Sequence, residues 1–205
     1  MQPDCPNIAA LMLLMTSRLE ETARSIDQES AGQLLDEILY AKRIYLAGAG
    51  RSGLVARAFA QRLMHLGFES YVIGETITPA FGRGDVLIAF SGSGETRSVV
   101  DACETAREIG GKICLVTSTP DSHIGRMADC IVEIGNDLLK DAHIPHDFEI
   151  RQLTGQYRSV SGSFAPLGTL FETAALVFSD AIVSALMEVR HCTPEELRSR
   201  LANVQ

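Results

Sequence analysis

The sequence predicts an α/β protein built in three layers, with helices on both faces of a five-stranded parallel sheet. Five short apolar segments lie between residues 43 and 134, each is followed by glycine or serine, and helical patterns separate them. Strands that are apolar throughout are typical of sheets buried on both faces. Their alternation with helices implies right-handed crossovers, and therefore a parallel, doubly wound sheet.

The composition predicts one soluble domain covering residues 1–205. The chain is 46% hydrophobic and 21% charged, which excludes a disordered or low-complexity protein. A domain of this length buries roughly 70% of the surface of its unfolded chain, so it needs no disulfide or metal for stability. The 18 basic and 26 acidic residues leave a net charge of −8, which disfavours nucleic acid as a partner.

Cysteine usage and hydropathy predict a cytoplasmic protein. The five cysteines are an odd number without a Cys-x-x-Cys pair, which is typical of reduced thiols. The apolar stretch at residues 8–15 follows Asp4 instead of basic residues and continues into a helical pattern, so we expect no signal peptide. We also find no run of the ~18 apolar residues that a membrane span needs.

The N-terminal segment, residues 1–41, is predicted to be helical from about residue 7, because apolar residues recur at spacings of three and four. The Ser30-Ala31-Gly32 stretch is the expected break in this segment. The α/β core then covers residues 43–134. Its predicted strands are residues 43–47, 70–73, 85–90, 112–117 and 129–134, and its longest predicted helices are residues 53–66 and 95–109.

The C-terminal part predicts an irregular insertion followed by helices over residues 164–205. Residues 135–163 mix charge with glycine and serine, and His143, His146 and Asp147 lie there in a His-x-x-His-Asp pattern. Histidines in a loop without a rigid scaffold seldom hold zinc, so we expect no metal. Residues 166–189 predict a long helix, apolar on most sides, which belongs in the core or at a subunit interface. A capping box at residues 193–196 opens a last short helix.

A glycine-rich loop, Gly48-Ala-Gly50-Arg51-Ser52-Gly53, joins the first predicted strand to a helix. This pattern fits the pyrophosphate of a dinucleotide at a helix N-terminus, and Glu75 falls where a ribose-binding acid is expected. A nicotinamide-dependent enzyme is therefore one reading. The other is that the glycines simply permit a tight turn.

A second loop, Ser91-Gly-Ser93-Gly-Glu95-Thr96, follows the third predicted strand and again opens a helix. Three hydroxyls and a series of backbone N–H groups converge there without a lysine, which favours a compact phosphate monoester. If the strand order reverses between strands one and three, both loops flank one crevice, and Ser52 can join Ser91 and Ser93. The alternative is that the serines cap the helix.

These motifs resemble the sugar isomerase (SIS) domain, and further stretches narrow the resemblance to the 6-phospho-3-hexuloisomerase family. They are RLMHLG at 62–67, VIGETITP at 72–79 and APLGTLFETAAL at 165–176, and the match runs from about residue 43 to residue 187. The SIS fold is flavodoxin-like. The insertion at about residues 136–161 departs from the family, and its role is open.

The resemblance implies interconversion of 3-hexulose 6-phosphate and fructose 6-phosphate through a cis-enediol, without a cofactor. It assigns Glu172 as the base, and a carboxyl group desolvated by apolar neighbours suits that work. From the residues alone, an acid that complements the dipole at a helix start is an equal alternative. It assigns His65 to ring opening or proton transfer in a neighbouring subunit's site. The phosphate and sugar are expected to contact Gly50, Arg51, Ser52, Ser91, Ser93, Thr96, Glu75 and Thr76. We expect Glu95 to complement a helix dipole in a first turn.

Three less favoured functions are a non-catalytic SIS module that senses a sugar phosphate, an isomerase of another phosphorylated sugar, and a nucleotide oxidoreductase. A regulator would carry a DNA-binding motif, whereas about 40 residues without a basic cluster precede the first predicted strand. The resemblance places the enzyme in the ribulose monophosphate pathway, in formaldehyde assimilation or pentose phosphate supply. It implies a dimer or tetramer of identical chains, with 3-hexulose-6-phosphate synthase as functional partner and neither nucleic acid nor membrane.

Overall fold

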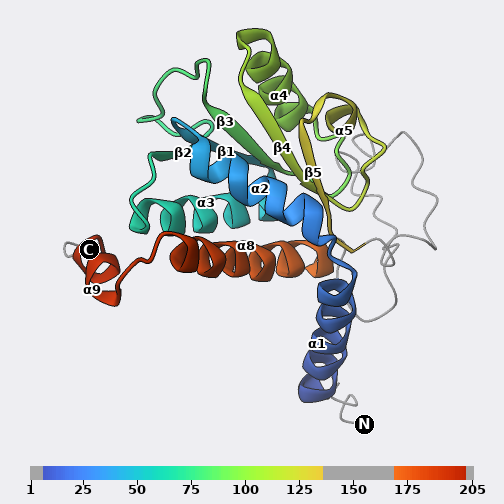
Figure 1. Cartoon of the computed structure of the whole chain (residues 1–205). Coiled ribbons are helices and arrows are strands. Elements are labelled where there is room, and N and C mark those ends of the chain that lie inside the picture. The colour runs from blue at the N-terminus through green and yellow to red at the C-terminus, as the bar shows by residue number, and fades with distance from the viewer. Residues whose placement is uncertain (1–6, 136–168, 202–205) are drawn as a thin grey trace.

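A computed structural model describes residues 7–135 and 169–201 of the chain. It contains one sheet of five strands, all parallel, in the order β2-β1-β3-β4-β5 (Figure 1). This is the doubly wound arrangement, and it confirms the predicted fold class. The strands are β1 (Ile44–Gly48), β2 (Ser70–Val72), β3 (Val86–Phe90), β4 (Lys112–Thr117) and β5 (Cys130–Glu133).

Helices cover both faces of the sheet. In the part of the chain that is described they are α1 (Ile8–Ser25), α2 (Gln28–Tyr40), α3 (Gly50–His65), α4 (Arg97–Ile109), α5 (His123–Met127), α8 (Thr169–Val189) and α9 (Pro194–Ser199). Helices α2, α3 and α8 lie on one face, and α4 and α5 lie on the other (Figure 1). Helix α5 was not predicted, because five residues are too few to show a helical period.

The core is divided by the sheet into two apolar clusters. Along β1, Ile44 and Leu46 face α2, α3 and α8, whereas Tyr45 and Ala47 face α4 and α5. Alternate residues of a strand point to opposite faces, so a strand that is apolar at every position fills both clusters. This explains why continuous apolar runs located the strands.

The N-terminal helical segment breaks at residues 26 and 27, so the predicted break at residues 30–32 was wrong. The Asp27 side chain accepts a hydrogen bond from the backbone N–H of Ser30 at 2.8 Å and thereby caps α2. Gly32 lies inside α2. An aspartate cap stabilises a helix start, whereas a single glycine is tolerated within a helix.

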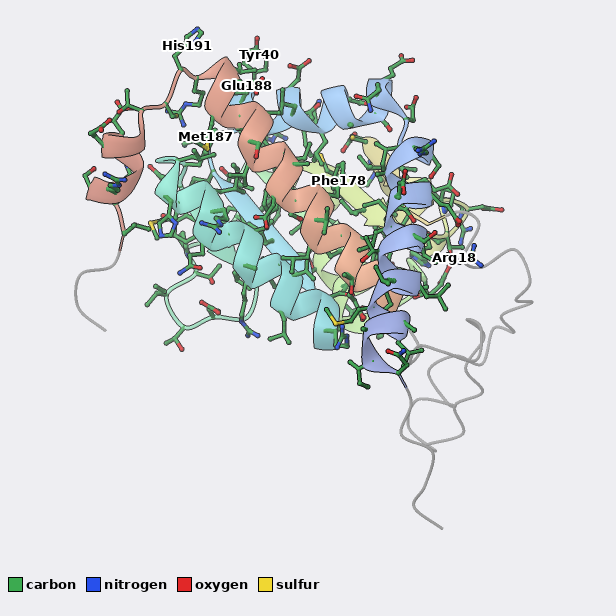
Figure 2. All side chains as sticks on the ribbon, turned by 90° about the horizontal axis from the view of Figure 1, so that it is seen from below. Arg18, Tyr40, Phe178, Met187, Glu188 and His191 are labelled. Atoms are coloured by element: carbon green, nitrogen blue, oxygen red, sulfur yellow. The ribbon has the colours of Figure 1, made fainter. Side chains whose placement is uncertain are left out.

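Helix α8 runs beside α3, and α1 crosses α8 near the beginning of α8 (Figure 2). Two contacts show that α3 and α8 run in the same direction. Arg62 pairs with Asp180 at 3.7 Å, and further along both segments the Arg190 guanidinium donates to the Leu66 carbonyl at 2.9 Å. By length and composition alone, the 20 residues Leu170–Val189 could cross a membrane, contrary to expectation. In this fold these residues form a helix that packs one face against the core, and core helices can have the same length and composition as membrane spans.

The C-terminal helix begins as its capping box predicts. The Glu196 N–H donates to the Thr193 hydroxyl at 3.2 Å, and the Thr193 N–H donates to the Glu196 carboxylate at 2.8 Å. The bond from the Thr193 N–H to the carboxylate lowers the pKa of Glu196. The reciprocal pair satisfies two N–H groups that a helix start otherwise leaves unpaired.

Candidate active site

The strand order reverses between β1 and β3, which are neighbours in the sheet. Gly48 at the end of β1 is in register with Phe90 at the end of β3. The two predicted anion loops therefore leave the sheet side by side at its carboxyl edge. Such a switch point is where doubly wound folds bind their ligands.

The first loop turns sharply because two glycines let the backbone close on itself. A Cβ on Gly48 would lie 2.7 Å from the Ser52 carbonyl oxygen, and one on Gly53 would lie 2.9 Å from the Gly48 carbonyl oxygen. Helix α3 consequently starts at Gly50, two residues after β1 ends. Arg51 and Ser52 occupy its first turn, at the N-terminal end that favours anions.

The second loop is ordered by its own hydroxyl groups. The buried Ser91 hydroxyl accepts a hydrogen bond from the Gly94 N–H at 3.2 Å and lies 3.5 Å from the Thr96 hydroxyl. The Ser93 hydroxyl accepts one from the Glu95 N–H at 3.2 Å. Both serines thus act inside the loop, before the N-cap of α4 at Thr96. The alternative that Ser91 and Ser93 cap the helix is therefore wrong, because the N-cap of α4 is Thr96.

The start of α8 contacts both loops. Arg51 Nε lies 2.8 Å from Glu172 Oε2, and the Glu172 side chain is 14% exposed. On the other loop, Gly92 faces the Phe171 ring, which would lie 3.2 Å from an added Cβ. Three segments distant in sequence therefore meet at the switch point, and they bring one shielded carboxylate to the two anion loops.

Glu75 and Thr76 lie elsewhere. The Glu75 carboxylate pairs with Arg57 of α3 at 3.0 Å, and both side chains are about half exposed. Arg57 is six residues beyond Arg51, about 9 Å along the helix axis. Thr76 is exposed in the loop after β2. Glu75 therefore faces the middle of α3, away from the pair formed by Arg51 and Glu172.

His65 lies at the last residue of α3, about 21 Å along the helix axis from Arg51. It is buried, and this desolvation, with the nearby charge of Arg62, lowers its pKa below the usual 6.5. Within one chain, His65 and Glu172 lie near opposite ends of α3. A joint role for them therefore requires His65 from a second chain.

The prediction that Glu95 lies in the first turn of α4 was wrong, because that helix begins two residues later, at Arg97. Its carboxylate instead accepts a hydrogen bond from the backbone N–H of His123 at 2.7 Å, at the start of α5. No local pattern indicated this contact, because α5 itself was not predicted. His143, His146 and Asp147 lie outside the described residues.

Comparisons with known proteins agree with this geometry. Residues 37–137 match the model of the SIS domain. A Bacillus subtilis protein named 3-hexulose-6-phosphate isomerase is 38% identical, covering 92% of this chain and 94% of its own, and a Mycobacterium gastri protein of the same name is 36% identical, covering 94% and 88%. A solved structure from Methanococcus jannaschii, from which that same function was inferred, is 30% identical with a TM-score of 0.75, covering 96% of this chain and 98% of its own.

Proposed function

Because this chain belongs to the SIS-domain family of 3-hexulose-6-phosphate isomerases, we propose that it interconverts D-arabino-3-hexulose 6-phosphate and D-fructose 6-phosphate. The observation that carries the proposal is the contact between Arg51 and Glu172. It joins a loop suited to phosphate with a shielded carboxylate, and sugar-phosphate isomerisation needs these two features in one site. The reading as a nucleotide oxidoreductase accounts for the first loop alone.

The phosphate is held by hydroxyl and N–H groups instead of by a positive overall field, because the net charge is −8. Ser91, Ser93 and Thr96 contribute hydroxyls from the second loop, and Ser52 contributes one from the first. The N-terminal turns of α3 and α4 add partial positive charge. A guanidinium has five N–H donors, so Arg51 can contact the phosphate while it keeps its bond to Glu172.

Glu172 is the base. Its carboxylate takes the proton from C2 of 3-hexulose 6-phosphate and returns it to C3, and the proton of the C2 hydroxyl moves to the C3 oxygen, which gives fructose 6-phosphate. The intermediate between the two steps is a cis-enediol. One base suffices, because C2 and C3 of a planar cis-enediol present the same face to the carboxylate. The low exposure of Glu172 keeps competing water away from the transfer.

The family resemblance gives His65 a role in proton transfer, and because Glu172 of its own chain is out of reach, we assign that role to the site of a second copy. A buried imidazole with a lowered pKa is neutral at physiological pH and can both accept and donate a proton. In this role it moves protons between the sugar oxygens or opens the sugar ring.

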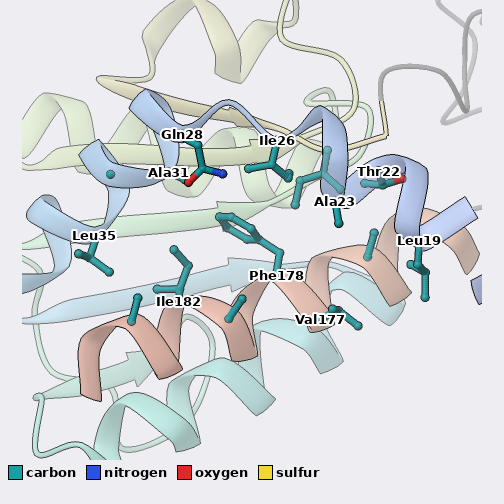
Figure 3. A pocket seen from close by; sticks show the side chains of 15 residues that line it. Leu19, Thr22, Ala23, Ile26, Gln28, Ala31, Leu35, Val177, Phe178 and Ile182 are labelled. Carbon is teal, nitrogen blue, oxygen red and sulfur yellow. The ribbon is translucent and has the colours of Figure 1, made fainter. Parts of the chain in front are cut away.

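Assembly into a homo-oligomer, a dimer or tetramer, is supported by the apolar surface of α1 and α8. The first half of α1 is apolar on all sides, and Ile8, Met12 and Leu13 are exposed, as is Val177 of α8. An apolar cavity of about 410 Å³ lies between α1, α2 and α8, with Phe178 and Ile182 projecting into it (Figure 3). A second copy covers this surface, since a helix that is apolar all round needs a partner.

In the cell, the enzyme would act in the cytoplasm in the ribulose monophosphate pathway, consuming the product of 3-hexulose-6-phosphate synthase. The test is a coupled assay in which synthetic 3-hexulose 6-phosphate is the substrate. Glucose-6-phosphate isomerase and glucose-6-phosphate dehydrogenase convert any fructose 6-phosphate formed into NADPH. We expect NADPH to form in proportion to the protein added, without added nucleotide or metal for the isomerase itself. Absence of conversion would refute the proposal.

A further inference from the structure

The second anion loop contains an acid, which is unexpected in a loop that holds a phosphate. Glu95 lies between the hydroxyl residues Ser93 and Thr96. A carboxylate pointing toward the ligand would repel a phosphate dianion. In the structure, the carboxylate points to α5 instead, and its Oε1 atom lies 2.7 Å from the backbone nitrogen of His123.

The segment that leads into α5 supports the second loop along its length. The Ser118 N–H donates to the Gly92 carbonyl at 3.1 Å, and the Ile124 N–H donates to the Gly94 carbonyl at 3.1 Å. Ser122 packs against Gly94 so closely that a Cβ on Gly94 would overlap the Ser122 side chain. Glu95 adds a charged side-chain bond to these backbone contacts, at the point where the loop turns into α4.

We infer that Glu95 is a positioning residue for the phosphate. Its bond to the His123 N–H fixes the backbone from Ser93 to Thr96, so that the hydroxyls of Ser93 and Thr96 can donate to the ligand. The same bond uses the negative charge at the start of a helix, where it is favourable. The inference rests on the proposed function, because it assumes that the loop binds a phosphate.

Two substitutions at Glu95 separate the hydrogen bond from the charge. Glu95→Ala removes both, and we expect it to weaken the binding of inorganic phosphate and to raise KM about tenfold, with kcat little changed. Glu95→Gln keeps an oxygen that can accept the His123 N–H and removes only the charge. We expect this variant to bind phosphate as well as the wild type, or more tightly. If Glu95→Ala binds phosphate more tightly, repulsion dominates and the inference is wrong.

The donor can be removed without touching Glu95. His123 is the first residue of α5, a position that proline favours, and Ser122 before it is extended with φ −136° and ψ 174°. His123→Pro therefore deletes the N–H with little cost to the helix, and we expect the same loss of phosphate affinity as in Glu95→Ala. The double variant should lose no more than either single variant. Additive losses would contradict the inference.

His123→Ala is the matched control. It keeps the backbone N–H and loses the contact between the imidazole and Glu104, which is 2.9 Å long. We expect wild-type phosphate affinity, and a loss equal to that of His123→Pro would show that the ring matters instead of the N–H. Urea unfolding of each variant separates a local change in the loop from global destabilisation.

Isothermal titration with inorganic phosphate measures binding without turnover and so separates the two proposals. A wild type that binds phosphate but converts no 3-hexulose 6-phosphate would refute the proposed function alone, and the comparison of the Glu95 and His123 variants would still decide the inference. A wild type that binds no phosphate at tens of millimolar would overturn the inference, and the coupled assay would still decide the proposed function.

Discussion

The Arg51 guanidinium lies 2.8 Å from the Glu172 carboxylate, although 121 residues separate them in sequence. Arg51 is in the first turn of α3 and Glu172 is in the first turn of α8. The arginine side chain is 58% exposed, whereas the glutamate side chain is 14% exposed. The pair therefore has a shielded carboxylate beneath a guanidinium that remains accessible to a ligand.

Replacing Arg51 should impair substrate binding more than folding. Because the side chain is largely exposed, its ion pair contributes about 0–1 kcal/mol to the free energy of unfolding. A charge-assisted bond to phosphate is worth more, so Arg51→Ala should raise KM by about 10- to 100-fold. Steady-state kinetics and urea unfolding measure the two effects. Arg62→Ala is the control, since Arg62 also links α3 to α8 and is 55% exposed. An equal rise in KM there would contradict the assignment.

Gly48→Ala should destabilise the first loop. The new Cβ would lie 2.7 Å from the Ser52 carbonyl oxygen, so β1 and α3 must move apart. We expect a loss of about 1–3 kcal/mol in the free energy of unfolding, together with weaker phosphate binding. Gly32→Ala is the control: nothing lies within 4 Å of its Cβ, and alanine inside α2 should stabilise by about 0.5–1 kcal/mol. Similar losses from both variants would show that contact with Ser52 is not the cause.

Stability should fall at acidic pH partly because of His65. Burial lowers its pKa in the folded state below the usual 6.5, so the unfolded chain takes up a proton first as the pH falls. The His65 contribution is complete above about pH 6.5 and is lost as the pH drops through that value toward the folded-state pKa. His65→Gln should therefore show a smaller decrease in the urea midpoint between pH 7.5 and pH 5. An unchanged decrease would show that other groups are responsible.

A charge on the apolar half of α1 should disrupt the oligomer. Leu13 is 71% exposed, so Leu13→Glu costs the isolated fold little but buries a carboxylate if a second copy covers this surface. Light scattering should show a lower mass for this variant than for the wild type. Thr105→Glu adds the same charge to exposed α4, on the other face of the sheet, and should leave the mass unchanged. A wild type that is already monomeric would refute the proposed assembly.

The sequence predicted those features that depend on local pattern. The five strands were located to within a residue or so at each end, because each is a continuous apolar run. The break before α2 was misplaced, since the cap formed by Asp27 outweighs the effect of Gly32 within the helix. Helix α5 was missed because it is only five residues long.

The contacts of the site depended on tertiary packing instead. Glycine and hydroxyl spacing identified both loops, and the resemblance singled out Glu172. The pairing of Glu172 with Arg51 follows from how α8 packs beside α3, which no local pattern encodes. The separation of His65 from Glu172 likewise became evident only from the direction of α3. The bond from Glu95 to His123 lies in the same class, because both partners are in loops or short helices.

The most direct measurement is the turnover of Glu172→Gln, alongside its affinity for phosphate. Glutamine fits the same space but cannot abstract a proton from carbon, so the rate in the coupled assay should fall by roughly two to four powers of ten. Titration calorimetry should meanwhile give nearly the wild-type dissociation constant for phosphate. A variant with undiminished turnover would show that proton transfer between the two carbons proceeds without the Glu172 carboxylate.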